Sequence, residues 1–366
     1  MTIILFLLVL AVLILVHELG HFLVARSANV RVDEFGLGFP PRATSWTPQG
    51  SETTYSLNWI PFGGFVKIVG EDGDAEGNMD PRSMVTKPAF VKVWILASGV
   101  IFNFLLAWLL FSVSFMTGLP TSIAPDTAGV IGTPAVTVID VVPQTPAAEA
   151  GLMPGDELVY FELPQSTDRV VVTSVEEVQT FVGARAGEPF TLGYRRGDVE
   201  REVEIIPTDT APGGRGAIGV GLDVIGLVKL PPHVALAEGM RTSLHVTNAI
   251  AVGLGKFIFA AFTGTADFSQ VAGPVGIVGL VGDAASRGIV ALLSFMALIS
   301  LNLAVLNLLP FPALDGGRIL FVIIESIKGS PIRQNVAQIV NTVGFGLLIL
   351  LMLIVTVSDV AKLIGN

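Results

Sequence analysis

Long runs of apolar residues are the feature that most limits what this chain can fold into. An unbroken run covers residues 3–16, and further runs cover residues 93–119, 289–309 and about 339–357. Each run, with its apolar flanks, reaches the roughly 20 residues with which an α-helix crosses a lipid bilayer. Buried core helices are the alternative, but only 14% of the residues are charged, against about 25% in soluble proteins. We therefore predict a multi-pass α-helical membrane protein with four transmembrane helices, in contact with membrane lipid.

The composition excludes several other classes of protein. A net charge of −10 argues against a partner made of nucleic acid, and a hydrophobic fraction of 51% argues against disorder. The chain has no Cys, so it carries neither disulfides nor thiolate metal sites. A bound metal would need His and carboxylate ligands, and the chain has only four His.

The distribution of Lys and Arg predicts the orientation in the membrane. Residues 26–92 carry seven of these cations, and the loop after the third run carries Arg318, Lys328 and Arg333. The positive-inside rule places both segments in the cytoplasm. Residues 120–288, with ten cations and nineteen acidic residues, then face outside. We expect both termini to be extracytoplasmic, in a bacterial cytoplasmic (inner) membrane.

The segment from 130 to 207 has the pattern of a soluble module. Residues 134–142, 189–195 and 199–206 alternate as strands do, and residues 174–186 have helical character with a capping box at Ser174 and Glu177. The run from Pro146 to Asp156 resembles the bacterial PDZ signature; the alternative is a generic small β-rich domain. A PDZ groove takes an extended peptide, so a peptide C-terminus is an expected partner.

The chemistry-bearing motif lies at the end of the first apolar run. His17-Glu18-Leu19-Gly20-His21 is an H-E-x-x-H sequence, and on a helix His17 and His21 are only about 40° apart, so they share a face. Two neutral imidazoles on one face suit Zn²⁺, and Glu18 is a candidate general base. A carboxylate near the hydrocarbon core costs about 2.5 kcal/mol or more, which favours a functional role over an incidental one.

Catalytic zinc usually has three protein ligands, and the end of the third run offers a candidate for the third. Asp315 follows Pro310 and Pro312 and precedes Gly316-Gly317, which interrupt the helix at the same membrane side as the two histidines. Irregular backbone at that depth is tolerated beside protein or a water-filled cavity. The alternative is an interfacial carboxylate at a helix end.

Taken together, these motifs resemble the bacterial site-2 proteases, specifically the RseP/RasP-type intramembrane zinc metalloproteases with one PDZ domain. The resemblance covers nearly the whole chain and implies zinc ligands His17, His21 and Asp315, with Glu18 as the catalytic base. It also implies that Asn307 contacts the substrate backbone or the oxyanion. The implied hydrolase cuts transmembrane segments of single-span proteins, such as anti-sigma factors or remnant signal peptides, in regulated intramembrane proteolysis.

The resemblance also implies a β-hairpin within residues 33–68 that re-enters the membrane near the zinc and pairs with substrate. Short strands are expected around Phe35–Pro40 and Trp59–Lys67, with Thr53–Leu57 between them; the alternative is an amphiphilic loop packed on the cytoplasmic face.

Residues 243–262 are apolar enough to suggest a fifth transmembrane helix. A crossing there would put Asp315 and the two histidines on opposite sides, so an amphipathic surface helix is predicted instead.

Four segments follow from these interpretations. Residues 1–119 hold two spans, H-E-x-x-H and the hairpin, and residues 125–225 form the extracytoplasmic PDZ domain. Residues 230–288 form an extracytoplasmic amphipathic region, and residues 289–366 hold two spans and the Leu-Asp-Gly motif.

Two other functions are alternatives to the protease. One is a catalytically dead adaptor that uses only its PDZ groove. The other is a solute channel, for which the inverted repeats typical of transporters are missing.

Overall fold

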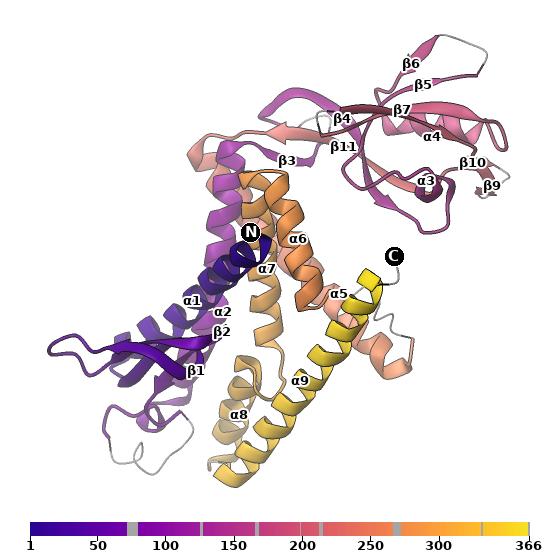
Figure 1. Ribbon diagram of the computed structural model, residues 1–366. Coiled ribbons are helices and arrows are strands. Elements are labelled where there is room, and N and C mark those ends of the chain that lie inside the picture. Colours follow the sequence, from indigo (N-terminus) through magenta and orange to yellow (C-terminus); the bar gives the residue numbers. More distant parts are fainter. Residues whose placement is uncertain are drawn as a thin grey trace. The chain divides into compact units, whose positions relative to one another are not determined.

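Long apolar helices dominate the first of two units in the computed structural model, which describes residues 1–71, 80–124, 127–164, 168–197, 199–211, 215–265, 272–330 and 332–364. The first unit joins Met1–Ser114 to Pro232–Asn366, and the second covers Phe115–Pro231. Figure 1 labels the long helices of the first unit: α1 (Thr2–Ser27), α2 (Ala89–Thr117, whose last three residues belong to the second unit), α5 (Pro232–Thr263), α6 (Pro274–Ser286), α7 (Ile289–Leu308), α8 (Asp315–Lys328) and α9 (Gln334–Ile364). A short 3₁₀ helix, η1 (Met84–Thr86), precedes α2.

The number of candidate membrane spans is five, where the sequence predicts four. Helices α1, α2, α7 and α9 correspond to the four apolar runs, and the fifth candidate is α5. The fifth candidate arises because the apolar stretch at 243–262 belongs to a helix that begins at Pro232 and extends for 32 residues. Its most apolar 18-residue window has a mean hydropathy of 1.5, against 2.2 to 2.8 in the other four. The chain is a multi-pass membrane protein.

Close helix packing surrounds α1 in the first unit. Gly20 of α1 lies against the backbone of Ser98 in α2, where a Cβ would come within 2.5 Å of the Ser98 carbonyl oxygen. Near its start, α1 contributes Phe6, Val9 and Leu13 to a buried cluster with residues of α6 and α7. Gly20 therefore lets α1 and α2 approach closely near the carboxyl end of α1, while the apolar cluster packs the amino-terminal half of α1.

The short helix α6 is held at its amino end by a carboxylate from the end of α9. Asp359 is buried, with 5% of its side chain exposed, and its Oδ2 accepts a hydrogen bond of 2.8 Å from the Gly276 amide. Gly273 is the N-cap of α6 and offers no side chain of its own for capping. Asp359 thus satisfies an amide of the first turn that would otherwise lack a partner, and it does so where the helix dipole favours negative charge.

Two long antiparallel strands follow α1 rather than the three short ones expected. They are β1 (Val32–Trp46) and β2 (Thr54–Ile68), which pair with several register shifts. The expected strands at 35–40 and 59–67 are therefore parts of longer ones, and 53–57 begins the second. The sequence hid this because Gly and Pro interrupt the alternation of side chains, and bulges absorb those interruptions.

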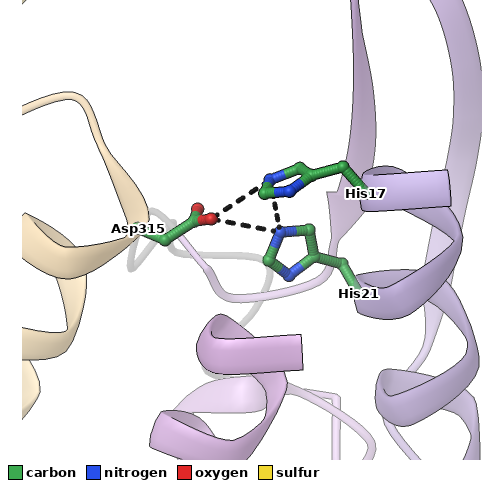
Figure 2. A group of neighbouring side chains, drawn as sticks. All are labelled: His17, His21 and Asp315. Carbon is green, nitrogen blue, oxygen red and sulfur yellow. Dashed lines mark hydrogen bonds and ion pairs between the residues drawn. The ribbon is translucent and has the colours of Figure 1, made fainter. Parts of the chain in front are cut away.

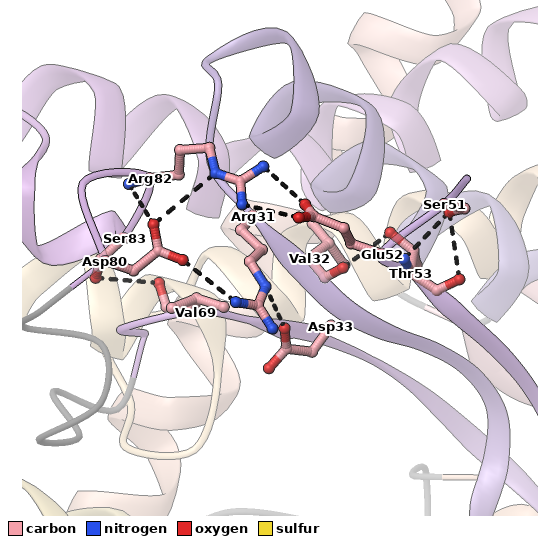
Figure 3. Close-up of polar contacts among 10 residues, drawn as sticks. All are labelled: Arg31, Val32, Asp33, Ser51, Glu52, Thr53, Val69, Asp80, Arg82 and Ser83. Carbon is pink, nitrogen blue, oxygen red and sulfur yellow. Dashed lines mark hydrogen bonds and ion pairs between the residues drawn. The ribbon is translucent and has the colours of Figure 1, made fainter. Parts of the chain in front are cut away.

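A polar network fastens the base of this hairpin to the segment before α2 (Figure 3). Arg82 forms two hydrogen bonds, of 2.7 and 3.1 Å, with the Glu52 carboxylate, while the Arg82 amide donates to Asp80. Arg31 lies between Asp33, at 2.9 Å, and Asp80, at 3.4 Å. The two arginines and three carboxylates form an alternating set, which anchors the hairpin next to α1.

The second unit is built around a sheet whose neighbouring strands are antiparallel. Its strands are β3 (Leu119–Ser122), β4 (Val130–Val141), β5 (Glu157–Glu162), β6 (Arg169–Val171), β7 (Phe190–Arg196), β8 (Val199–Ile205) and β11 (Val220–Val228), in the order β3-β11-β4-β5-β7-β8 with β6 on β5. Strands β9 (Thr208–Ala211) and β10 (Arg215–Ala217) form a separate pair, and the helices are α3 (Pro146–Glu149) and α4 (Val175–Gly183). The predicted strands and helix of this module are confirmed within a few residues.

Aromatic packing and one charged pair hold the second unit together. Phe181 of α4 stacks on Phe161 of β5, with ring centroids 4.2 Å apart, and meets Phe190 edge-on. In the turn before β5, the carboxylate of Asp156 is 1% exposed and accepts two hydrogen bonds of 2.7 Å from the Arg196 guanidinium. The same carboxylate accepts from the Met153 amide at 2.9 Å. Asp156 therefore shapes the turn that ends the PDZ-like sequence run.

The amino end of α4 carries the predicted cap. Ser174 is the N-cap, and its hydroxyl accepts a hydrogen bond from the Glu177 amide at 3.1 Å. The Glu177 carboxylate reaches back to the Thr173 hydroxyl at 2.7 Å and the Thr173 amide at 3.0 Å. The hydrogen bonds from Thr173 lower the pKa of Glu177 below its ordinary value, since they favour the charged form.

Candidate metal centre

Three potential metal ligands from distant parts of the sequence meet in the first unit. His17 and His21 lie one turn apart on α1, and Asp315 is the first residue of α8. Asp315 Oδ2 lies 3.1 Å from His17 Nε2 and 3.4 Å from His21 Nε2, and the two nitrogens are 3.3 Å apart. Figure 2 shows both rings pointing from one helix toward the carboxylate. Among the described residues, this is the one group of three His or acidic side chains whose ligand atoms all lie within 4.8 Å of one another.

The opposite ring nitrogens of the two histidines face polar groups of α2. His21 Nδ1 lies 2.9 Å from the backbone carbonyl of Ile95. Because a carbonyl only accepts, Nδ1 of His21 carries the proton, and Nε2 of the neutral ring presents its lone pair to the cluster. His17 Nδ1 lies 3.2 Å from the side-chain amide of Asn103. Both rings are thus oriented by a second contact behind the cluster.

These residues fit a zinc ion. Two imidazoles and one carboxylate are a ligand set of catalytic zinc sites, which keep a fourth position for water. Gly99 of α2 leaves the space for the rings, because a Cβ there would overlap His21 Nε2 and His17 Cε1. Asp315 Oδ2 is buried and has no regular hydrogen bond among the described residues apart from its ion-pair contacts with the imidazoles. A cation would satisfy that oxygen.

A cavity of about 430 Å³ opens beside the cluster and also contains Glu18. The hairpin forms part of its wall, and Gly64 of β2 packs against Glu18, where a Cβ would lie 3.0 Å from Glu18 Cγ. Glu71 and Arg318, an ion pair between the end of β2 and α8, line it as well. The described lining residues are His17, Glu18, His21, Phe39, Gly64, Phe65, Val66, Lys67, Ile68, Glu71, Ala313, Asp315 and Arg318. The cavity therefore places Glu18 beside the three candidate ligands.

The predicted site residues do not all meet at this cavity. His17, Glu18, His21 and Asp315 line it, whereas Asn307 lies at the carboxyl end of α7 and is not among the described lining residues. His233 and His245, expected to be ordinary surface histidines, both belong to α5. The proposed role of Asn307 stays a prediction.

Two residues that contact the cluster were missed by sequence reasoning. Gly99 and Asn103 are one helical turn apart on α2, and both face His17. The available signal was a small residue followed four positions later by an amide within the apolar run 93–119. A buried polar side chain in such a run is functional by default, so Asn103 could have been identified.

Comparison with known proteins places the chain in a family. Residues 5–351 match the model of Peptidase family M50. A Nostoc sp. (strain PCC 7120) protein, assigned by name to the zinc metalloproteases, is 35% identical over 97% of this chain and 94% of its own length. The zinc metalloprotease RasP of Geobacillus kaustophilus is 29% identical over 99% of this chain and 98% of its own length.

About a quarter of the chain is also similar to a solved structure. The PDZ domain of an SdrC-like protein from Listeria monocytogenes matches 25% of this chain and 90% of its own, at 22% identity and a TM-score of 0.22. That score is too low to assign a fold. The family match and the relatives, which span nearly the whole chain, agree with the three converging ligands. The chain belongs to Peptidase family M50 and is a zinc metalloprotease.

Proposed function

We propose that this protease hydrolyses peptide bonds inside transmembrane segments of single-span membrane proteins. The observation that carries the proposal is the position of the ligand cluster: His17 and His21 belong to a helix long and apolar enough to cross a membrane. A protease of soluble proteins would have no reason to bear its metal ligands there, since polar residues at that depth are costly. Substrates of this kind include anti-sigma factors and remnant signal peptides.

Each polar residue of the site has a proposed part in the chemistry. His17, His21 and Asp315 hold the zinc, which when bound supplies the Lewis acidity that activates water and polarises a scissile carbonyl. Glu18, in the same cavity, takes a proton from the attacking water and delivers it to the leaving amine. Asn307 donates a hydrogen bond to the substrate backbone or to the developing oxyanion.

The hairpin is the proposed docking strand for substrate. A transmembrane helix satisfies its amides internally, so it must unwind before a protease can reach a peptide bond. Gly64 to Ile68 of β2 line the cavity, and within the described residues β2 pairs with β1 alone. An unwound substrate can add to the open edge as a further strand.

The proposed topology keeps four spans, with α5 lying along the outer membrane surface and both termini outside. The low mean hydropathy of α5 supports this, as do the polar residues His245, Asn248 and Lys256 within it. A crossing by α5 would reverse α7 and separate the ends that carry the ligands. The four segments proposed from the sequence keep their boundaries, with 125–225 as an extracytoplasmic PDZ domain.

The PDZ domain is proposed to act as a gate on substrate entry. The sequence run Pro146 to Asp156 and the order of strands and helices in the second unit support a PDZ assignment. Such a domain binds a peptide C-terminus and can exclude proteins whose outer domains remain bulky by steric clash. Deletion of residues 130–207 should then keep chemistry and loosen selectivity. A folded, zinc-loaded deletion variant that still rejects untrimmed substrate as strictly as the full chain would refute the gate.

Cleavage by the purified protein tests the proposed activity. The full chain in detergent is incubated with single-span membrane proteins whose outer domains have been removed, with and without a zinc chelator. We expect cuts within the apolar segment that stop with the chelator and resume when zinc is restored. Cleavage confined to soluble polypeptides, with every transmembrane segment left intact, would overturn the proposal.

A further inference from the structure

A buried amide side chain behind His17 is the feature that the proposed chemistry does not use. Asn103 lies in the middle of α2 and is completely buried. Its backbone carbonyl accepts a hydrogen bond of 2.8 Å from Ser300 Oγ of α7, itself buried. Asn103 is therefore fixed between α1 and α7, one turn beyond the glycine that makes room for the imidazoles.

The contact between Asn103 and His17 determines which nitrogen of His17 can bind a metal. A neutral imidazole has one N–H and one lone pair. If the amide NH₂ donates to Nδ1, the ring proton sits on Nε2, and that nitrogen cannot be a ligand. If the amide oxygen accepts from Nδ1–H, the lone pair is on Nε2, which faces Asp315 Oδ2 at 3.1 Å. The two cases differ by a half-turn of the amide and by which ring nitrogen carries the proton.

The ligand cluster favours the second arrangement, because only that arrangement leaves a lone pair on His17 Nε2, the nitrogen that faces Asp315 Oδ2. Asn103 Nδ2 lies 3.2 Å from His17 Nδ1, while Asn103 Oδ1 is buried with no hydrogen-bond partner among the described residues. A half-turn exchanges the two atoms and gives the oxygen the Nδ1–H of His17 as a donor. His21 follows the same rule, since the Ile95 carbonyl already holds its Nδ1–H.

We propose that Asn103 is a positioning residue of the zinc site: its amide oxygen accepts the Nδ1–H of His17 and keeps Nε2 as the metal-binding nitrogen. The inference rests on the proposed ligand set and deepens it. Contacts of this kind behind a ligating histidine typically change metal affinity by about 10- to 100-fold. The side chain does not touch substrate, so its effect must pass through His17.

Two substitutions at one position separate the hydrogen bond from packing. Asn103→Leu keeps the size and removes the acceptor, while Asn103→Asp keeps an oxygen that accepts the same proton. The control is Ser112→Ala, at another buried position of α2 whose hydroxyl bonds to the Trp108 carbonyl of its own helix. Thermal unfolding of the zinc-free proteins in detergent shows which variants are folded.

Zinc affinity, measured by competition with a chelator, is the first readout. We expect about 10- to 100-fold weaker binding for Asn103→Leu, and affinities within about threefold of the original for Asn103→Asp and Ser112→Ala. A folded Asn103→Leu protein with unchanged zinc affinity would overturn the inference, as would an Asn103→Asp protein as impaired as Asn103→Leu. Failure of the original protein to bind zinc would instead refute the ligand set, and the inference with it.

Nitrogen-15 NMR of labelled histidine rings reads the tautomer directly, and the chain has only four His to resolve. We expect the ring of His17, assigned by loss of its signals in His17→Ala, to carry its proton on Nδ1 in the zinc-bound protein. The signal of that ring should change in Asn103→Leu and persist in Asn103→Asp. A proton on Nε2 of His17 in the zinc-bound original protein would contradict the proposal independently of any affinity.

Discussion

His17 Nε2 and Asp315 Oδ2 lie 3.1 Å apart, although one residue belongs to the first helix and the other begins the eighth. The contact joins a local motif to a distant carboxylate, so the ligand set depends on the whole first unit. We predict about one zinc ion per chain. Asp315→Asn weakens the charge that holds the metal and should cut zinc content sharply, as measured by elemental analysis.

The controls for this prediction are the two remaining histidines. His233→Ala and His245→Ala remove imidazoles of α5 that play no part in the cluster, so zinc content should not change. Zinc retained in a His17/His21 double mutant would show that the ligands lie elsewhere.

Glu18→Gln should separate metal binding from catalysis. The three proposed ligands remain, so zinc content should stay near one per chain, while loss of the proposed general base should lower the cleavage rate by about 10²- to 10⁴-fold. Glu188→Gln is the control, since Glu188 is an exposed residue of the second unit, whereas the ligand cluster and the hairpin belong to the first. Turnover by the Glu18 variant at the original rate would remove Glu18 from the mechanism.

Gly99→Ala should damage the metal site through steric overlap alone. The added methyl group would collide with both imidazoles, so zinc affinity should fall although no polar group is lost. Gly253→Ala in α5 is the matched control, because a Cβ at that glycine meets open space. Equal zinc affinity in the two variants would contradict this prediction, because it would show that α2 shifts enough to make room for the added methyl group.

Arg196→Met should destabilise the second unit by about 3 kcal/mol, because it leaves the buried Asp156 carboxylate without its partner. Arg195→Met breaks only the half-exposed pair with Glu157 and should cost less than about 1 kcal/mol. Hydrogen exchange of the amides in residues 151–156, followed by mass spectrometry, compares the two. Similar protection in both variants would show that the pair of Asp156 with Arg196 does not hold the turn before β5.

The stability of α4 should depend on pH through Glu177. Its pKa is lowered in the folded state by the hydrogen bonds from Thr173, so the stabilisation is complete above the ordinary Glu value and is lost as the pH falls through the lower, folded-state value. Glu177→Gln should remove this dependence, and Glu176→Gln should not. The measurement is amide hydrogen exchange in α4 as a function of pH, corrected for the intrinsic pH effect. If the original protein and both variants show the same pH dependence, Glu177 is not the group responsible.

The local motifs and the grouping of Asp315 with the two histidines could be predicted from the sequence, whereas the contacts of α2 behind them could not. The spacing of His17 and His21 is enough to place both on one helix face, and the break of the third run at Pro310 and Pro312 identified Asp315. The role of Asn103 escaped because it depends on the distance between two helices, which no periodicity within either helix encodes. The extent of α5 was underestimated because polar residues before 243 do not stop a helix.

The separation of His21 from Asp315 along the chain also sets an order of events during synthesis. Residues of the second unit are translated between the two, so that unit can fold before the third ligand exists. At translation rates of about 5–20 residues per second, roughly 15 to 60 s pass between the second ligand and the third. Throughout that interval the nascent chain lacks a complete metal site, so it cannot hydrolyse peptide bonds, its own included, until it is nearly finished.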